Sequence, residues 1–276
     1  MPAQEEVSTH YTHGNLAAEI QDGIEKLGKT TDSITIDDLA PIDEFHVGGR
    51  EASEHFTSQL GLTPDKRVLD VGCGLGGPAR FVASRYHCPV DGIDLTPEYV
   101  EAGRMICGWV GLADRVHLHQ GSALSLPFDD AAFDAAYMLH VGMNIEDKAR
   151  LCSEVARALR PGGLFGIYDI MKTGDGELTF PVPWASVPSS SAVAEPAQYR
   201  NALQAAGFTI TAELNRRDFA LAFFQQLRAR TMAAGGPPPL GLHILMGKTA
   251  PEKIQNMTQN ILKGLLAPVE MIARKA

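Results

Sequence analysis

A ten-residue run constrains the fold of this chain more than any other segment. It occupies positions 68–77 and reads Val-Leu-Asp-Val-Gly-Cys-Gly-Leu-Gly-Gly. The run predicts a buried strand that ends near Asp70, a glycine turn, and a helix that begins near Pro78. Such a turn points backbone N–H groups outward at a helix N-terminus, with no Cβ in the way. The segment therefore predicts a nucleotide-binding loop.

Downstream of residue 67 the chain alternates apolar segments with segments of helical spacing. This alternation predicts a parallel sheet with right-handed crossovers, and so an α/β fold. Strands are expected at residues 67–71, 89–94, 116–120, 133–138, 165–169, 208–214 and 267–273. Helices are expected at residues 78–86, 96–108, 145–159 and 195–206.

The residues before this alternation read as a helical arm. Leu16, Ile20 and Ile24 recur at helical spacing and predict an amphipathic helix. We expect a loop at residues 34–42 and a second helix at residues 51–60.

Two parts are expected from this organisation. Residues 1–60 are predicted to form an N-terminal arm or lid, and residues 61–276 the main domain. Within that domain, residues 171–196 are rich in Pro, Ser and Gly, and residues 218–264 add about three helical pieces. Both stretches are expected to be cap insertions over a substrate site.

The glycines are compatible with two kinds of cofactor. Gly72, Gly74 and Gly77 satisfy the dinucleotide fingerprint G-x-G-x-x-G. Asp94 lies 20 residues beyond Gly74, where an acid that binds a ribose belongs. A nicotinamide-dependent oxidoreductase is therefore one reading of the pattern. An acid two residues before the first glycine, Asp70, favours a different ligand.

The pattern Asp70-x-Gly72-x-Gly74-x-Gly76 resembles the first motif of class I S-adenosylmethionine-dependent methyltransferases. Leu126-Pro-Phe128 and the turn Arg160-Pro-Gly-Gly163 are similar to later motifs of the same family. The resemblance is to its small-molecule type, which includes ubiquinone, tocopherol and sarcosine-dimethylglycine methyltransferases. It implies a Rossmann-like seven-stranded sheet, mostly parallel, with strand seven antiparallel. It also implies S-adenosylmethionine as cofactor and S-adenosylhomocysteine as product.

The strand ends give the candidate cofactor-binding residues, because open α/β sheets bind ligands beyond the carboxyl ends of their strands. They are Asp70, Gly72, Gly74, Gly76, Asp94, Leu95, Ser122, Ala123 and His140. Asp94 is expected to accept both ribose hydroxyls, and its alternative role is a helix N-cap. Ser122 stands where the family usually carries an acid that contacts adenine.

His140 ends the fourth strand and is the candidate catalytic residue. A histidine there can act as a general base, or it can position other groups. The candidate substrate-binding residues are His46, Met143, Asn144, Tyr168 and Trp184. The alternatives are packed aromatic side chains for Tyr168 and Trp184, and a loop histidine for His46.

The resemblance implies methyl transfer by direct displacement to a small-molecule acceptor, with nitrogen or oxygen favoured as the methylated atom. Two other functions stay open. One is the nicotinamide-dependent oxidoreductase, and the other is a protein that binds S-adenosylmethionine in a non-methylating role, such as a cyclase or a regulator.

Charge and composition bear on partners and compartment. The net charge of −9 and the lack of a basic run argue against nucleic acid, and no stretch is apolar enough to suggest a membrane partner. The N-terminus lacks the features of a signal peptide, and the four cysteines have no C-x-x-C spacing, so a cytoplasmic protein is expected. His117 and His119 share a strand face but lack further ligands, so no metal site is expected. A homodimer is compatible with these features.

Overall fold

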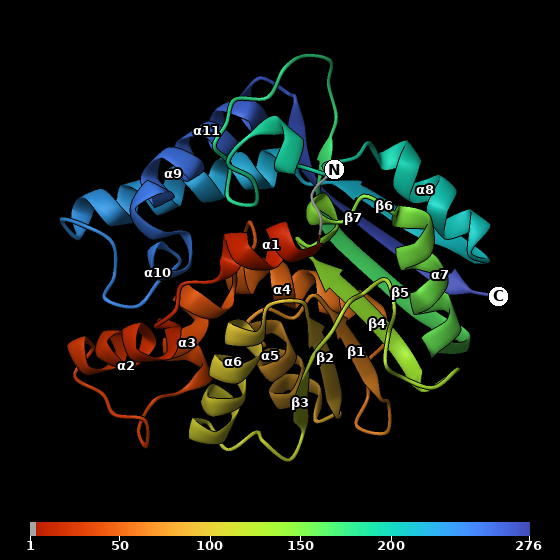
Figure 1. The fold of residues 1–276 in the computed structure, drawn as a ribbon, viewed down its shortest axis with the longest axis horizontal. Helices are drawn as coiled ribbons and strands as arrows, with labels where there is room; N and C mark the ends of the chain where they lie inside the picture. Colours follow the sequence, from red (N-terminus) through yellow and green to blue (C-terminus); the bar gives the residue numbers. More distant parts are fainter. Residues whose placement is uncertain (1–3) are drawn as a thin grey trace.

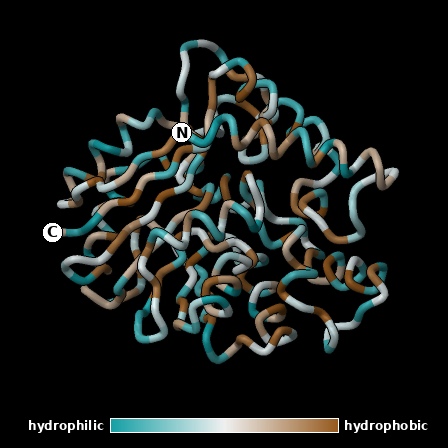
Figure 2. Tube along the Cα trace, turned by 180° about the vertical axis from the view of Figure 1, so that it is seen from behind, coloured by the Kyte–Doolittle hydropathy of each residue, from teal (hydrophilic) through white to brown (hydrophobic). Residues whose placement is uncertain are grey.

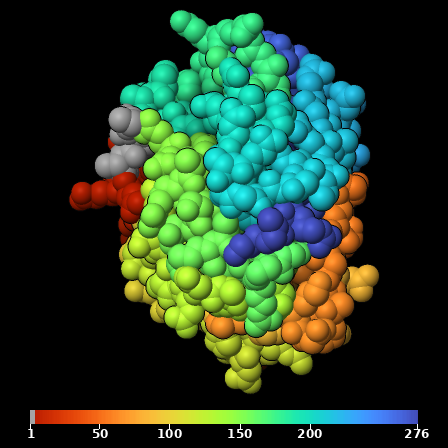
Figure 3. All heavy atoms as spheres, turned by 90° about the vertical axis from the view of Figure 1, so that its right-hand side faces the viewer, coloured from red at the N-terminus to blue at the C-terminus, as the bar shows by residue number. Residues whose placement is uncertain are grey.

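A seven-stranded sheet forms the centre of the computed structural model, which describes residues 4–276 (Figure 1). The strands are β1 (Val68–Val71), β2 (Val90–Asp94), β3 (Val116–Gln120), β4 (Phe133–Leu139), β5 (Leu159–Lys172), β6 (Phe208–Asn215) and β7 (Leu266–Lys275). Their order is β3-β2-β1-β4-β5-β7-β6, with β7 antiparallel to both neighbours. Figure 3 shows the end of β7, in dark blue, between the green of β5 and the cyan of β6. The predicted α/β fold and its antiparallel last strand are confirmed.

Helices cover both faces of the sheet. The helices α7 (Lys148–Ala158) and α8 (Pro196–Ala205) pack on one face, and α4 (Gly49–Thr57), α5 (Gly77–Tyr86) and α6 (Pro97–Trp109) pack on the other. Figure 2 shows hydrophobic residues running along the central strands between these layers. The central strands β1, β4 and β7 are apolar because both of their faces are buried.

The N-terminal segment is more helical than its sequence predicts. It contains α1 (Gln4–Tyr11), α2 (Leu16–Lys26), α3 (Ile36–Asp43) and the short η1 (Ser58–Leu60). The loop expected at residues 34–42 is wrong, because α3 occupies most of that range. Thr35 and Asp38 form a capping box that starts this helix.

A buried ion pair joins α3 to the glycine loop. The side chains of Asp43 and Arg80 are fully buried, and the guanidinium donates to the Asp43 carboxylate at 2.5 Å. The same guanidinium also donates to the carbonyl of Leu75 at 2.6 Å. Arg80 therefore links the N-terminal segment to the loop between β1 and α5.

In the C-terminal half of the chain, two long segments between strands of the sheet lie outside it. The first is the irregular stretch 173–195, with a single short turn η3 (Pro188–Ser190). The second follows β6 and contains α9 (Arg217–Ala233), α10 (His243–Met246), η4 (Gly247–Thr249) and α11 (Ala250–Leu262). Both pack into one apolar cluster with Val47 and Met143. Among the helices within residues 4–276, none is both long and apolar enough to cross a membrane.

One strand is longer than expected. The prediction of residues 165–169 for the fifth strand covers only part of β5. Phe133 lies opposite Leu159 and Ala135 lies opposite Leu164, so the intervening residues of β5 form a wide bulge. The Arg-Pro-Gly-Gly turn lies in this bulge.

Candidate active site

The glycine loop joins β1 to α5 at the carboxyl end of the sheet. The N–H groups of Gly72 and Cys73 donate to the carbonyl of Ile93 at 2.8 and 3.0 Å, which holds the loop against β2. Gly72 has a φ of +74°, and a Cβ at this position would overlap the side chain of Val141. A glycine is therefore required here for steric reasons. The loop lies at the edge where α/β sheets bind ligands, and Gly72 and Gly74 line a cavity there.

Asp94 holds the loop from the neighbouring strand. Its Oδ2 accepts a hydrogen bond of 2.8 Å from the N–H of Gly74, and its Oδ1 accepts one of 2.9 Å from the N–H of Thr96. Thr96, rather than Asp94, occupies the N-cap position of α6. Burial raises the pKa of Asp94. Each carboxylate oxygen keeps a lone pair available, so two hydroxyl groups fit this carboxylate.

Asp70 and Ser122 provide further polar groups at the same edge. Asp70 accepts a hydrogen bond of 3.1 Å from Tyr137, and burial raises its pKa to about 8. A cationic ligand beside this carboxyl group would favour the ionised form. Ser122 Oγ accepts hydrogen bonds from the side chain of Gln4 at 2.9 Å and from the N–H of Leu124 at 3.1 Å.

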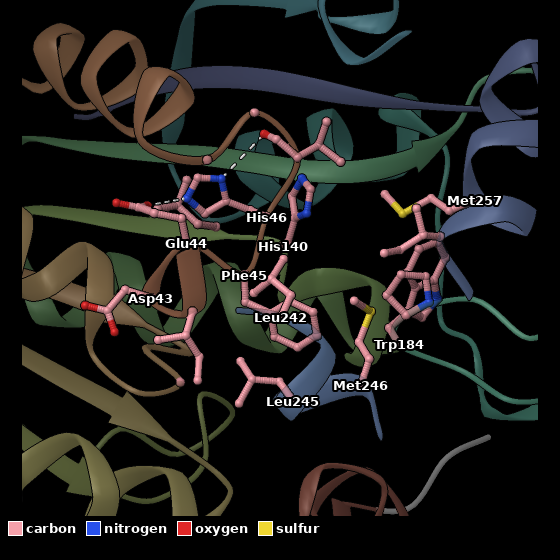
Figure 4. Close-up of a pocket in the computed structure, with 18 of the residues that line it drawn as sticks. Asp43, Glu44, Phe45, His46, His140, Trp184, Leu242, Leu245, Met246 and Met257 are labelled. Atoms are coloured by element: carbon pink, nitrogen blue, oxygen red, sulfur yellow. Dashed lines mark hydrogen bonds and ion pairs between the residues drawn. The ribbon is translucent and has the colours of Figure 1, made fainter. Parts of the chain in front are cut away.

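Two histidines lie together beyond β4, as Figure 4 shows. The ring centroids of His46 and His140 are 5.9 Å apart. His46 Nε2 lies 2.9 Å from Glu44 and 3.0 Å from Ser53. Although burial raises the pKa of Glu44, hydrogen bonds from His46 and Ser53 and the charge of Arg50 hold it at about 2. Glu44 is therefore ionised and holds the ring of His46 in place.

His140 has an unusual backbone conformation and a neutral ring. Its φ is +54°, a left-handed value that is uncommon outside glycine. Its N–H donates to the carbonyl of Tyr168 at 2.7 Å, while its Nε2 is buried without a hydrogen-bond partner among residues 4–276. Burial and the nearby His46 lower the pKa of His140 well below 6.5. The imidazole is therefore neutral, and its buried Nε2 has no partner within the described residues.

The glycine loop, Asp94 and His140 line one continuous cavity of about 2300 Å³. Residues 69–167, which contain all three, match the sequence model of a methyltransferase domain. The chain contains a methyltransferase domain. Domains of this class use S-adenosylmethionine, and the free lone pairs of Asp94 and the backbone of Gly72 and Gly74, which line the cavity, fit its nucleoside and methionine parts.

Several curated proteins are similar to part of this chain. The chain is 35% identical over 121 residues to a sterol 24-C-methyltransferase of Gibberella zeae, which is 44% of this chain and 32% of that protein. The matched segments span only 27% to 49% of the first three curated relatives.

Two solved structures share the fold across the whole chain. Geranyl diphosphate C-methyltransferase from Streptomyces coelicolor A3(2) has a TM-score of 0.72 at 18% identity, covering 100% of both chains. The [4+2]-cyclase SpnF has a TM-score of 0.69 at 23% identity, covering 99% of this chain and 97% of its own.

Most of the predicted site residues face the cavity of the methyltransferase domain. They are His46, Asp70, Gly72, Gly74, Asp94, Leu95, Ser122, Ala123, His140, Met143, Asn144 and Trp184. Gly76 and Tyr168 do not line it. Gly76 caps α5, and a Cβ there would lie 2.8 Å from Leu118. Tyr168 is fully buried, donates to the carbonyl of Val47 at 3.0 Å, and packs 5.0 Å from the ring of His140.

Two of the predicted acceptor residues are tied to other parts of the chain. The side-chain amide of Asn144 donates to the hydroxyl group of Tyr11 at 3.1 Å, which joins α1 to the turn after β4. Trp184 Nε1 donates to Ser191 at 2.9 Å, so its indole is fixed within the stretch 173–195.

Three contributors to this cavity that the sequence analysis missed come from the N-terminal segment. Tyr11 and Gln4 come from α1, which carries no strong amphipathic pattern. Glu44 comes from the end of α3, two residues before His46, and this acid–x–histidine spacing is the signal that was available.

Proposed function

We propose that this protein is an enzyme that methylates a nitrogen or an oxygen atom of a small organic acceptor. The observation that carries the proposal is the continuity of the cavity, which joins the glycine loop and Asp94 to His140. When bound, S-adenosylmethionine supplies a methyl group on a positively charged sulfur and becomes S-adenosylhomocysteine after transfer. Transfer would release the sulfur with its bonding electron pair, and the proton of the acceptor would pass to the imidazole of His140.

The residues of the site have distinct roles in this proposal. Asp94 accepts both ribose hydroxyls, and Leu95 packs on the adenine face. Ser122 and Ala123 contact the adenine edge. The hydrogen bond to adenine there involves the uncharged hydroxyl group of Ser122 instead of the acid that is usual in the family. Asp70, Gly72 and Gly74 border the methionine part. Positioning of donor and acceptor in a dry site accounts for most of the catalysis.

We also propose that residues 1–60 act as an arm over the cofactor, and that residues 61–276 form the catalytic domain with caps at 171–196 and 218–264. The hydrogen bonds from Gln4 to Ser122 and between Tyr11 and Asn144 support this division. In this proposal, Gln4 of α1 lies beside the adenine contact Ser122.

His140 is expected to remove the proton of the acceptor. In a His140→Gln variant we expect kcat to fall about 100-fold, the lower end of the range for a general base, because the methyl group is already activated. Since the pKa of His140 is lowered, its neutral form persists, and kcat of the wild type stays level from about pH 8 down to pH 6.5. His117→Gln, on the exposed face of β3, is the matched control. Normal turnover in His140→Gln assigns His140 a positioning role instead.

The test of the function is transfer of an isotope-labelled methyl group. The protein is incubated with labelled S-adenosylmethionine and a metabolite extract, and the products are identified by mass spectrometry. We expect a labelled small molecule whose new methyl group is on nitrogen or oxygen. Calorimetry on the same sample measures cofactor affinity.

Each other result points to a different function. Cofactor binding with no labelled product in any extract contradicts the proposal and favours a non-methylating role. SpnF, which is named as a [4+2]-cyclase, is an example of such a role on this fold. Binding of a nicotinamide cofactor in place of S-adenosylmethionine favours the oxidoreductase. A label on a carbon atom supports methyl transfer but contradicts the proposal that nitrogen or oxygen is methylated.

A further inference from the structure

We infer that the acceptor is a bulky, uncharged and largely apolar molecule with one polar group, bound in an apolar chamber beside His140. This inference rests on the proposed function and names the substrate class of the same site. The chamber is the part of the cavity bounded by α9, α10, α11 and the stretch 173–195.

The size of the cavity is the first argument. Its volume is about 2300 Å³, whereas pockets for drug-sized ligands usually measure about 300–1,000 Å³. A nucleoside cofactor fills a space of that ordinary size. The remaining volume leaves room for an acceptor beside the cofactor.

The walls of the chamber come from four segments and are mostly apolar, although Gln225 and Gln226 of α9 and Gln255 of α11 also line the cavity. Trp184 lies in the stretch 173–195, Phe223 and Leu227 lie on α9, Leu245 lies on α10, and Met257 lies on α11. Figure 4 shows Trp184, Met246 and Met257 on the side of His140 that is opposite Glu44. Apolar walls of this kind favour a ligand that buries hydrocarbon surface.

Positive charge is not available in the chamber for a phosphate or a diphosphate. Of the arginines that line the cavity, Arg50 is paired with Glu44 at 2.5 Å, and Arg228 and Arg230 are exposed at the rim. Burial lowers the pKa of His243, so this lining histidine is neutral. The buried Lys253 of α11 does not line the cavity. Residues 4–276 also hold no cluster of metal-binding side chains that would bridge a diphosphate through a cation.

Negative charge for an ammonium group is equally unavailable. The buried carboxylates nearest the chamber are already paired, Asp43 with Arg80 and Glu44 with Arg50. The other lining carboxylates belong to the nucleoside end or are exposed at the rim, and they are Asp70, Asp94, Glu51, Glu146, Asp147 and Asp218. A charged acceptor would therefore lose its hydration without gaining a partner.

The polar group of the acceptor belongs at His140. Figure 4 shows this imidazole between Glu44 and the apolar side chains of Trp184 and Met257, and its Nε2 has no partner among the described residues. An apolar molecule with one hydroxyl group fits both the unpartnered Nε2 of His140 and the apolar walls. The hydrocarbon part lies against α9 and α11, and the hydroxyl group faces His140.

The experiment measures binding of neutral and charged ligands that share one hydrocarbon chain. The uncharged fluorophore N-phenyl-1-naphthylamine reports occupation of the chamber in protein saturated with S-adenosylhomocysteine. Farnesol and farnesyl diphosphate then compete for the probe, and dimethylglycine serves as a small charged competitor. We expect farnesol to displace the probe at a concentration at least about tenfold lower than farnesyl diphosphate, because the diphosphate would be buried unpaired.

Two lysine variants locate the probe. Leu227→Lys places a charge on the chamber wall and is expected to weaken probe binding about tenfold. Leu214→Lys is the same change on the exposed face of β6, outside the cavity, and is expected to leave probe binding unchanged. Calorimetry with S-adenosylhomocysteine confirms that each variant is folded.

Three results overturn the inference. They are no probe binding by protein that binds S-adenosylhomocysteine, displacement by farnesyl diphosphate or dimethylglycine as effective as that by farnesol, and equal weakening by the two lysine variants. The comparison of farnesol with its diphosphate uses wild-type protein and decides the matter even if Leu227→Lys does not fold. Failure of the proposed function is distinguishable, because it shows as loss of cofactor binding or of methyl transfer while the probe still binds.

Discussion

Replacement of Asp94 with alanine is expected to raise the dissociation constant for S-adenosylmethionine about 10²–10⁴-fold, as measured by calorimetry. The carboxylate is proposed to accept two ribose hydroxyls, and each charge-assisted bond contributes about 1.5–3 kcal/mol. The variant also removes the acceptors for the N–H groups of Gly74 and Thr96, which hold the glycine loop in shape.

Two further variants separate these contributions. Asp94→Asn keeps one acceptor oxygen, so we expect an intermediate loss of affinity. Asp114→Ala changes an exposed acid beyond α6 and is expected to leave affinity unchanged. Unchanged affinity in Asp94→Ala removes this residue from the cofactor site.

A second large effect is expected in stability. The Asp43→Ala variant is expected to have a free energy of unfolding about 3–5 kcal/mol lower than that of the wild type, because the guanidinium of Arg80 stays buried without its carboxylate. Arg80 also donates to Leu75, so the glycine loop is expected to become more mobile. Denaturant unfolding measures the free energy, and hydrogen exchange in the loop measures the mobility.

An exposed ion pair provides the comparison. Lys26 and Asp22 are bonded on the solvent face of α2, with 62% and 60% of their side chains exposed. Asp22→Ala is expected to cost only about 0.3–0.5 kcal/mol, because water screens the pair. Equal losses in Asp22→Ala and Asp43→Ala would contradict the structural role assigned to Arg80.

The centre of the fold was predictable because its signals are local. The expected strand at 67–71 and helix at 78–86 each begin within one residue of β1 and α5. A run of apolar residues, a glycine turn and an early proline are sufficient to specify a strand, a loop and a helix. The antiparallel last strand was predictable only from the family resemblance.

The N-terminal segment was harder to predict because its helices depend on tertiary contacts. Pro41 lies inside α3, where it argues against a helix, yet Leu39 and Ile42 are fully buried against neighbouring helices. The capping box at Thr35 was a readable signal that the loop prediction overlooked.

The site was predictable at strand ends and less so elsewhere. The position of Asp94 follows from topology, since parallel strands end at one edge. Tyr168 is also at a strand end, but its hydroxyl group donates to the carbonyl of Val47, and its ring packs against the rings of His46 and His140. Period-two alternation cannot distinguish a residue facing a ligand from one facing a loop packed above it. Glu44 and Tyr11 reach the site from distant segments, which a strand-end rule does not consider.

The chamber walls lie on two segments outside the sheet, one between β5 and α8 and the other between β6 and β7. The helix α9 contributes only Ala220 and Phe224 as buried residues, so most of its positions carry little of the stability of the core. Substitutions there can accumulate without unfolding the protein. The nucleoside end has no such freedom, because Gly72 and Asp94 are held by the sheet itself. Proteins of this architecture can therefore diverge rapidly in what they recognise while their cofactor half changes slowly, in keeping with a family match confined to residues 69–167.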